Sequence, residues 1–188
     1  MSTTPARAPR SDALANRGKI LDSARKQFAS EGTEVSMNEI ARRAGVGVAT
    51  LYRHFPQRDD LVAAIYAEEL ASLGGAVDEF LASMTPDDAL TAWGARLLEY
   101  AITKRGLGAA LLAMRERGDV RVDARGVLID SMNKLLAAGR EAGTIVDDVT
   151  GEDLMTAISG LWVLPVDEQY PDRARRLLAL VFAGLRSV

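Results

Sequence analysis

The chain has 188 residues, of which 48% are hydrophobic and 26% are charged, proportions typical of a soluble globular protein with a sizeable core. It contains no cysteine, which excludes disulfides and thiolate metal sites. No apolar run reaches the roughly 18 residues needed to span a bilayer, so we expect no membrane helix. The polar N-terminus lacks the apolar stretch of a secretory signal, and we therefore expect a cytoplasmic protein.

The net charge of −3 is unevenly distributed along the chain. Residues 1–58 contain ten lysines and arginines against five acidic residues, whereas residues 59–188 contain thirteen against twenty-one. A basic N-terminal part suits a polyanion such as DNA, and the acidic remainder does not. Solvated surface charge explains the same pattern, so the division alone does not establish nucleic-acid binding.

The N-terminal residues predict an arm followed by a helix. Residues 1–11 contain two prolines with Arg7 and Arg10 and no apolar periodicity, which predicts a disordered basic arm. This arm either contacts the phosphates or minor groove of a duplex or stays unbound. Apolar residues then recur at three- and four-residue spacing, which predicts a helix from about Asp12 to Ser30 that Gly32 ends.

Two short helices are expected next. Ser36 followed by Glu39 has the spacing of a capping box, which opens a helix over about Met37 to Ala44. The segment 45–47 interrupts it, and a second helix covers Val48 to His54. Short helices joined by a tight glycine turn form a helix-turn-helix, in which the second helix enters the major groove of DNA.

The rest of the chain also predicts helices rather than strands. Their expected ranges are Arg58–Ser83, Thr85–Lys104, Gly106–Arg117, Asp123–Glu141, Thr150–Leu164 and Pro171–Arg186. The predicted fold is therefore all-α. It consists of a three-helix DNA-binding domain over residues 12–57 and a helical bundle over residues 58–188.

The segment from Ser36 to Leu61 resembles the N-terminal domain of the tetracycline-repressor-like TetR/AcrR family. The resemblance rests on Ile40-Ala41, Ala44-Gly45-Val46, Thr50-Leu51-Tyr52, His54-Phe55-Pro56 and Leu61. It implies a sequence-specific DNA-binding transcriptional regulator, in most cases a repressor released by a small-molecule effector. It also implies a homodimer on a pseudo-palindromic double-stranded operator, without enzymatic activity or cofactor.

The resemblance implies two kinds of DNA contact. Phosphate contacts are expected from Ser36, Thr50, Tyr52, His54 and Arg58, and base contacts from Asn38, Gly47, Val48 and Ala49. Most of the base-reading positions are small or apolar, so readout would depend on thymine methyl groups and on Asn38 pairing with adenine. The operator sequence does not follow from these residues. The single histidine has no cysteine with which to share a metal, and no metal site is expected.

In the family, the C-terminal helices enclose the effector pocket. We assign its lining to apolar and aromatic residues that recur at helical spacing, namely Trp93, Leu97, Tyr100, Leu111, Met114 and Met132. Methionine and aromatic side chains suit an adaptable pocket, although a stripe of this kind more often forms a plain core. The identity of the effector does not follow from the sequence.

The last two helices in the family pack against their copy in a second chain. The apolar faces assigned to this dimer interface contain Leu154, Ile158, Leu161, Trp162, Leu178, Val181 and Leu185. The alternative is that these residues form an intramolecular core, because a single chain must also cover both helices.

Two other classes of function are alternatives to a regulator. The acidic pairs Asp87-Asp88, Asp147-Asp148 and Glu152-Asp153 could suggest an enzyme, but each lies near a helix start, where acids complement the helix dipole. The chain has no glycine-rich phosphate loop and no arrangement of nucleophile and base. An architectural DNA-binding protein without an effector is the second alternative, and a body without an internal cavity would favour it.

Overall fold

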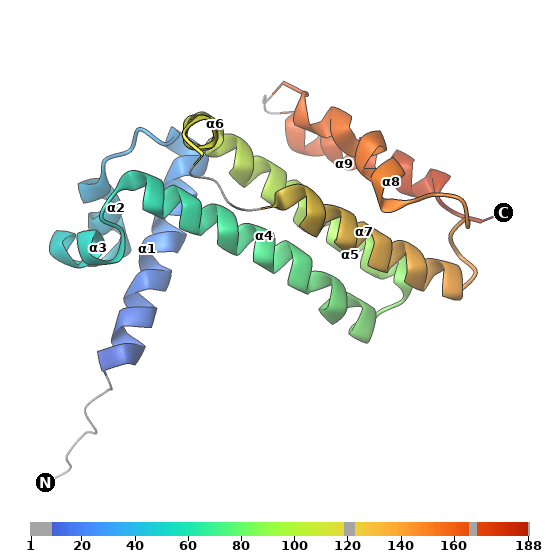
Figure 1. Cartoon of the computed structure of the whole chain (residues 1–188), viewed down its shortest axis with the longest axis horizontal. Coiled ribbons are helices and arrows are strands. Elements are labelled where there is room, and N and C mark those ends of the chain that lie inside the picture. The colour runs from blue at the N-terminus through green and yellow to red at the C-terminus, as the bar shows by residue number, and fades with distance from the viewer. Residues whose placement is uncertain (1–8, 119–122, 166–168, 188) are drawn as a thin grey trace, which may run out of the picture. The chain divides into compact units, whose positions relative to one another are not determined.

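A computed structural model describes residues 9–118, 123–165 and 169–187 of the chain. Within these residues the secondary structure is helical, and the predicted all-α class is confirmed (Figure 1). The elements in order are α1 (Pro9–Glu31), α2 (Met37–Ala44), α3 (Val48–His54), α4 (Arg58–Ser83), α5 (Pro86–Gly106), α6 (Gly108–Glu116), α7 (Ala124–Glu141), α8 (Gly151–Ile158), the 3₁₀ helix η1 (Ser159–Trp162) and α9 (Tyr170–Gly184). None of the described helices is long and apolar enough to cross a membrane.

The described residues divide into two compact units, and the divisions fall inside α4 and α5. Unit 1 contains residues 9–67 and 103–118, and unit 2 contains residues 68–102, 123–165 and 169–187. This division differs from the boundary expected after residue 57, because the start of α4, the end of α5 and the whole of α6 belong with the helix-turn-helix.

In unit 1, α1 packs against α2 and α3. Its Ile20, Leu21, Ala24 and Phe28 are all buried, as their three- and four-residue spacing predicted. The helix begins at Pro9 rather than near Asp12, so residues 9–11, which were assigned to the arm, are helical. Proline is favourable at this position because the first turn of a helix does not need its missing N–H. The rest of the arm, residues 1–8, lies outside the described residues.

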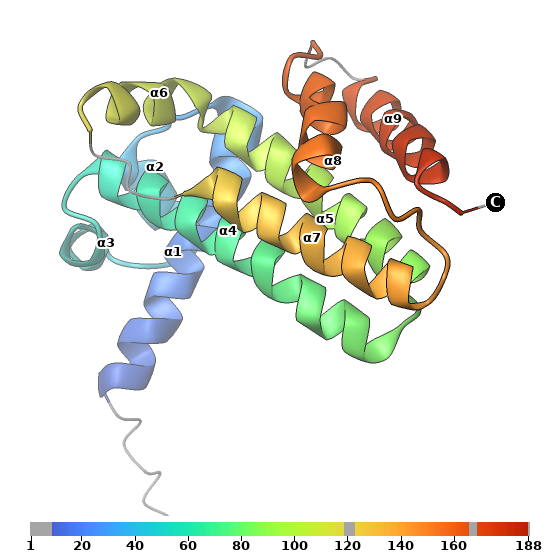
Figure 2. The same ribbon diagram turned by 45° about the vertical axis from the view of Figure 1, so that its right-hand side comes forward.

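In unit 2, the C-terminal part of α4, α5 and α7 lie side by side (Figures 1 and 2). The indole Nε1 of Trp93 donates to the Leu73 carbonyl oxygen at 3.1 Å, which joins α5 to α4 in the core. The start of α8 is held against α7, because the Gly151 amide donates to Asn133 Oδ1 at 2.8 Å. Helix α9 then packs against α8.

The residues at the end of α9 are hydrogen-bonded to the loop between α7 and α8. Ile145 and Arg186 form an isolated antiparallel bridge. Beside it, the Val146 amide donates to the Leu185 carbonyl at 2.9 Å, and the Ser187 amide donates to the Thr144 carbonyl at 3.1 Å. The backbone on both sides of Arg186 is therefore fixed within unit 2.

Candidate functional site

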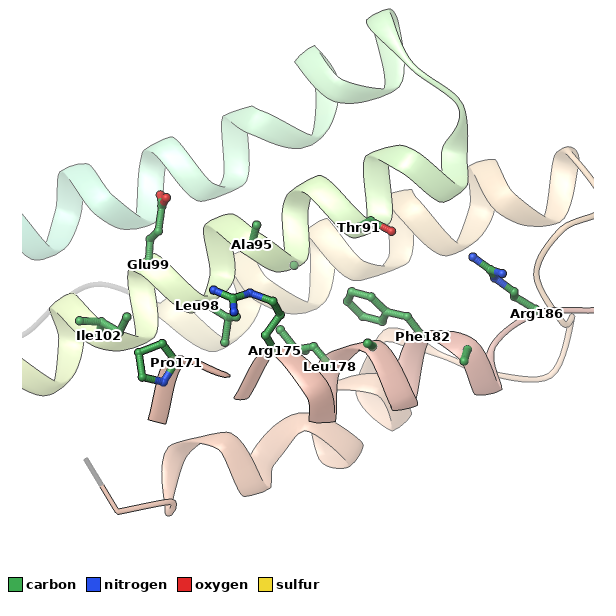
Figure 3. A pocket seen from close by; sticks show the side chains of 13 residues that line it. Thr91, Ala95, Leu98, Glu99, Ile102, Pro171, Arg175, Leu178, Phe182 and Arg186 are labelled. Carbon is green, nitrogen blue, oxygen red and sulfur yellow. The ribbon is translucent and has the colours of Figure 1, made fainter. Parts of the chain in front are cut away.

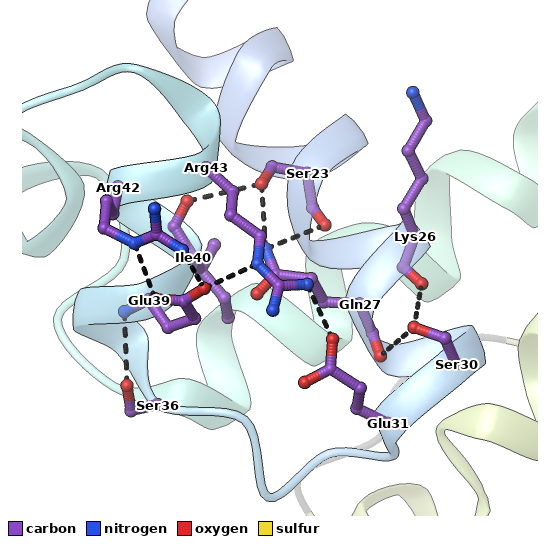
Figure 4. Close-up of polar contacts among 10 residues, drawn as sticks. All are labelled: Ser23, Lys26, Gln27, Ser30, Glu31, Ser36, Glu39, Ile40, Arg42 and Arg43. Carbon is purple, nitrogen blue, oxygen red and sulfur yellow. Dashed lines mark hydrogen bonds and ion pairs between the residues drawn. The ribbon is translucent and has the colours of Figure 1, made fainter.

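Helix α2 begins where the sequence predicted, with Ser36 as its N-cap. The Ser36 hydroxyl oxygen accepts a hydrogen bond from the Glu39 amide at 3.2 Å. The expected capping box is incomplete, because the Glu39 carboxylate turns outward to two arginines of its own helix (Figure 4). Positively charged guanidinium groups attract a carboxylate more strongly than the neutral N-cap amide does.

The turn between α2 and α3 requires glycine. Gly45 has a φ of 66°, in the left-handed region that favours glycine, and the next amide, that of Val46, donates to the Ala41 carbonyl at 3.1 Å. On the inner side of the turn, Leu51 is fully buried, while Val46 is half-buried. The turn and the Leu51 contact together fix how α3 lies on unit 1.

The outer face of α3 carries large side chains that unit 1 does not cover. Val48 is 43% exposed and Tyr52 is 45% exposed, and Ala49 and Arg53 are exposed beside them. The Arg53 guanidinium contacts the Ala49 carbonyl oxygen at 3.3 Å. The apolar and phenolic groups on this face of α3 are therefore available to a partner.

The other predicted DNA-contact residues belong to the same unit. Ser36 and Asn38 are exposed at the start of α2, and Gly47 is the exposed N-cap of α3. Thr50, His54 and Arg58 are half-buried, with Arg58 as the first residue of α4. None of these side chains is fully buried. In the described part of the chain, no group of three or more acidic, histidine or cysteine residues could hold a metal ion.

A charge cluster that sequence reasoning did not identify joins α1 to α2. Glu39 accepts from Arg42 Nη2 at 2.5 Å and from Arg43 Nε at 2.6 Å, and Arg43 Nη1 also reaches Glu31 Oε1 at 2.6 Å (Figure 4). Hydrogen bonds from Arg42 and then Arg43 lower the pKa of the Glu39 carboxyl to about 2. Within unit 1, both arginines of α2 are therefore paired with carboxylates.

This cluster predicts a pH-dependent contribution to stability. The pKa of Glu39 is depressed in the folded chain, so its stabilising effect is present above the ordinary value of 4.5 and is lost as the pH falls from there toward 2. Glu39→Gln should therefore lower the melting temperature modestly at pH 7, and the difference should shrink below pH 4. Thermal unfolding followed by circular dichroism measures both values. A difference that persists unchanged at the lowest pH would contradict the ion-pair origin.

The residues assigned to the effector pocket belong to two different units and are largely core. Trp93, Leu97, Tyr100 and Met132 are buried in unit 2, whereas Met114 is buried and Leu111 half-buried in unit 1. The Tyr100 ring meets the Trp162 ring edge-on, with centroids 6.0 Å apart.

Unit 2 contains a cavity between α5 and α9 (Figure 3). It has a volume of about 470 Å³, within the range of small-molecule sites. None of the residues predicted to line the pocket borders it. Its walls are formed by residues such as Leu98, Ile102, Leu178 and Phe182, with Arg175 and Arg186 beside them. The predicted residues of α5 lie on the opposite, core-facing side of that helix, because helical spacing of apolar residues identifies the buried side.

The residues assigned to the dimer interface are mostly buried within the single chain. Leu154, Ile158, Leu161, Leu178 and Leu185 are at most 5% exposed, and Trp162 and Val181 are half-buried. These five leucine and isoleucine residues have little surface left uncovered in the single chain. The apolar surface that remains uncovered on α9 contains Leu177 and Leu180, which are 38% and 71% exposed.

Comparison with known proteins agrees with the helix-turn-helix and extends to the second unit. Residues 20–65 match the family described as "Bacterial regulatory proteins, tetR family", and residues 85–187 match "Transcriptional regulator SbtR-like, C-terminal domain". The HTH-type transcriptional regulator SAB2452 of Staphylococcus aureus is 51% identical over 53 residues, which are 28% of this chain and 29% of that protein. The chain thus matches less than a third of that curated relative's length.

Two solved structures are similar over nearly the whole chain. The TetR transcriptional regulator SCO0520 from Streptomyces coelicolor is 38% identical with a TM-score of 0.83, covering 92% of this chain and 99% of that one. The TetR transcription regulatory protein from Mycobacterium vanbaalenii is 30% identical with a TM-score of 0.77, covering 96% and 100%. This chain therefore belongs to the TetR family of DNA-binding transcriptional regulators, which are not enzymes.

Proposed function

We propose that this chain is a repressor that binds a pseudo-palindromic operator as a homodimer and leaves it when a small-molecule effector binds. The observation that carries this proposal is the outer face of α3, where Val48 and Tyr52 are exposed on a helix held by a glycine turn. An α-helix presented in this way fits the major groove of B-DNA.

Within this proposal the contacts to DNA have separate tasks. Thr50 and Tyr52 donate hydrogen bonds to phosphates, and further phosphate contacts come from Ser36, His54 and Arg58. These contacts position the helix without reading the DNA sequence. Asn38, Val48 and Ala49 meet base edges, and Gly47 lets the backbone approach them closely.

The dimer interface that we propose uses the exposed faces of α8 and α9 rather than their buried residues. On α9 these are Leu177, Leu180 and Gly184, and on the α8 side they are Ala157 and Gly160, all exposed. Small residues allow close approach of the helices, and the two leucines supply the apolar surface that a second copy would cover. Two such chains would present two copies of α3 to successive major grooves.

Control by an effector requires a site that distinguishes the DNA-binding state from the released state. To shift the equilibrium from 1:99 to 99:1, the effector must favour the released state by about 5.5 kcal/mol. The cavity between α5 and α9 is the site that we propose for it. Its presence also argues against the alternative of an architectural DNA-binding protein without an effector.

DNA binding should weaken steeply as salt is added. The basic excess of residues 1–58 is doubled in a dimer, so several phosphates are neutralised and the logarithm of affinity should fall by about 0.9 per phosphate for each unit of log salt. Fluorescence anisotropy with a labelled operator at increasing salt gives this slope. Arg58→Gln removes one phosphate contact from each of the two chains and should make the slope shallower by about 1.8. Arg176→Gln, on α9 in the other unit, should leave the slope unchanged. A slope near zero in the wild-type protein would contradict the proposed phosphate contacts.

A further inference from the structure

The cavity between α5 and α9 has a wall in which an aromatic ring lies directly on helix backbone. A Cβ atom at Gly94 would lie only 2.6 Å from Cε2 of Phe182, so glycine is the residue that lets this ring approach α5. Leu98 and Leu178, both buried, continue the wall (Figure 3). The cavity therefore offers a continuous aromatic and aliphatic surface to the apolar body of a ligand.

Two cationic side chains border the same space. Figure 3 shows the Arg175 guanidinium beside Leu98, and the Arg186 guanidinium on the side that carries Thr91 and Phe182. Arg175 is ion-paired with Asp172 at 2.6 Å. Among the contacts of the described residues, Arg186 has no carboxylate within ion-pair distance. Of the two arginines at the cavity, Arg186 is therefore the one whose charge is available to a ligand.

The acidic residue at the cavity does not cancel this charge. Glu99 borders the space, but its carboxylate is paired with Arg96 at 2.7 Å. Arg186 has an exposed side chain, and its backbone is fixed by the bridge to Ile145. A fixed backbone reduces the entropy lost when the guanidinium engages a ligand.

From this arrangement we infer that the cavity binds an amphipathic organic monoanion. Its carboxylate is held by the Arg186 guanidinium, whose planar donors match a carboxylate in two parallel hydrogen bonds. Its apolar body lies along Phe182 and Leu98. The further claim that this ligand is the effector rests on the proposed function. The claim that the cavity binds it stands independently of that function.

Helix α9 can contact the ligand on one side and a second copy of the chain on another. Leu180 follows Arg175 by five positions, which places it about 140° around α9 at 100° per residue. The cavity-facing side of α9 and the proposed dimer-facing side are thus different flanks. A ligand that displaces α9 would change how two copies meet, which links the cavity to the spacing of the two DNA-binding units.

Isothermal titration calorimetry of the full-length protein without DNA tests the site. The probes are hexanoate, octanoate and decanoate, with decanol as the uncharged match for decanoate. We expect decanoate to bind one molecule per chain and decanol to bind at least about tenfold more weakly, because it lacks the charge that Arg186 recognises. If none of the carboxylates binds, or if decanol binds as tightly as decanoate, the inference is overturned.

Two variants and a control locate the binding. Arg186→Gln should weaken decanoate binding by about tenfold to a hundredfold. Arg176→Gln makes the same change on the same helix at an exposed position that does not border the cavity, and it should bind like wild type. Ala95→Phe fills the cavity from an exposed position on α5 and should abolish binding without altering the sedimentation mass. Unchanged binding by Arg186→Gln would overturn the inference, as would loss of the dimer in Ala95→Phe, which would mean that a second copy occupies the space.

A separate measurement distinguishes failure of the site from failure of the proposed function. Operator affinity is measured by anisotropy with and without saturating decanoate, in wild type and in Arg186→Gln. We expect decanoate to weaken operator binding by wild type only. Decanoate that binds at Arg186 yet leaves operator affinity unchanged would refute its role as effector and keep the site, whereas failed calorimetry would refute the site and leave the DNA-binding function untouched.

Discussion

Leu180→Asp should convert the proposed homodimer into monomers and lower operator affinity by at least about a hundredfold. Leu180 is 71% exposed on α9, so a carboxylate there leaves the single chain intact. In the dimer the same carboxylate would be buried without a partner, at a cost of several kcal/mol. Sedimentation equilibrium gives the mass, and anisotropy gives the affinity of the untouched DNA-binding unit.

Leu112→Asp is the matched control for this experiment. Leu112 is 59% exposed on a helix of unit 1, and the substitution introduces the same charge away from the proposed interface. It should leave the mass and the circular dichroism spectrum unchanged. A fully dimeric Leu180→Asp protein would mean that α9 does not form the interface through this face.

Tyr52→Ala should weaken binding to operator and to unrelated DNA by a similar factor, about tenfold or more. The lost phenol donates to a phosphate in the proposed complex, and phosphate contacts position the protein without specifying sequence. Anisotropy with both duplexes measures the two affinities. Because the Tyr52 side chain is exposed on α3, circular dichroism should show an intact fold.

Leu112→Ala removes another exposed side chain of unit 1 and should bind both duplexes like wild type. If Tyr52→Ala also bound operator as tightly as wild type, α3 would not be the recognition helix. A selective loss of operator binding with unchanged binding to unrelated DNA would instead assign Tyr52 to base reading.

The DNA-binding unit was predictable from the sequence because its determinants are local. Ser36 and Gly45 fix the ends of α2 through the N-cap and the left-handed turn, and the spacing of Ile20, Leu21 and Phe28 identifies the buried face of α1. Each of these signals acts within a few residues. At Glu39 two local patterns compete, because the capping-box spacing to Ser36 and the i+3 and i+4 spacing to Arg42 and Arg43 use the same carboxylate.

The second unit was less predictable because helical periodicity marks a buried face without saying what buries it. Trp93 and Ile158 both follow the pattern, and both are covered by their own chain. The cavity joins residues from α5 with residues such as Phe182 on α9, which are far apart in the sequence. No spacing rule brings such residues together, so the site could be found only from the fold.

Selection of bound duplexes from a random pool tests the central claim most directly. If two copies of α3 read successive major grooves, full-length protein should enrich an inverted repeat whose half-site centres are about 34–36 Å apart or a multiple of that distance. The same selection with Tyr52→Ala should recover the repeat more weakly. Enrichment of a single half-site without symmetry would contradict the dimeric operator, and a pool that remains random would contradict sequence-specific DNA binding by this face of α3.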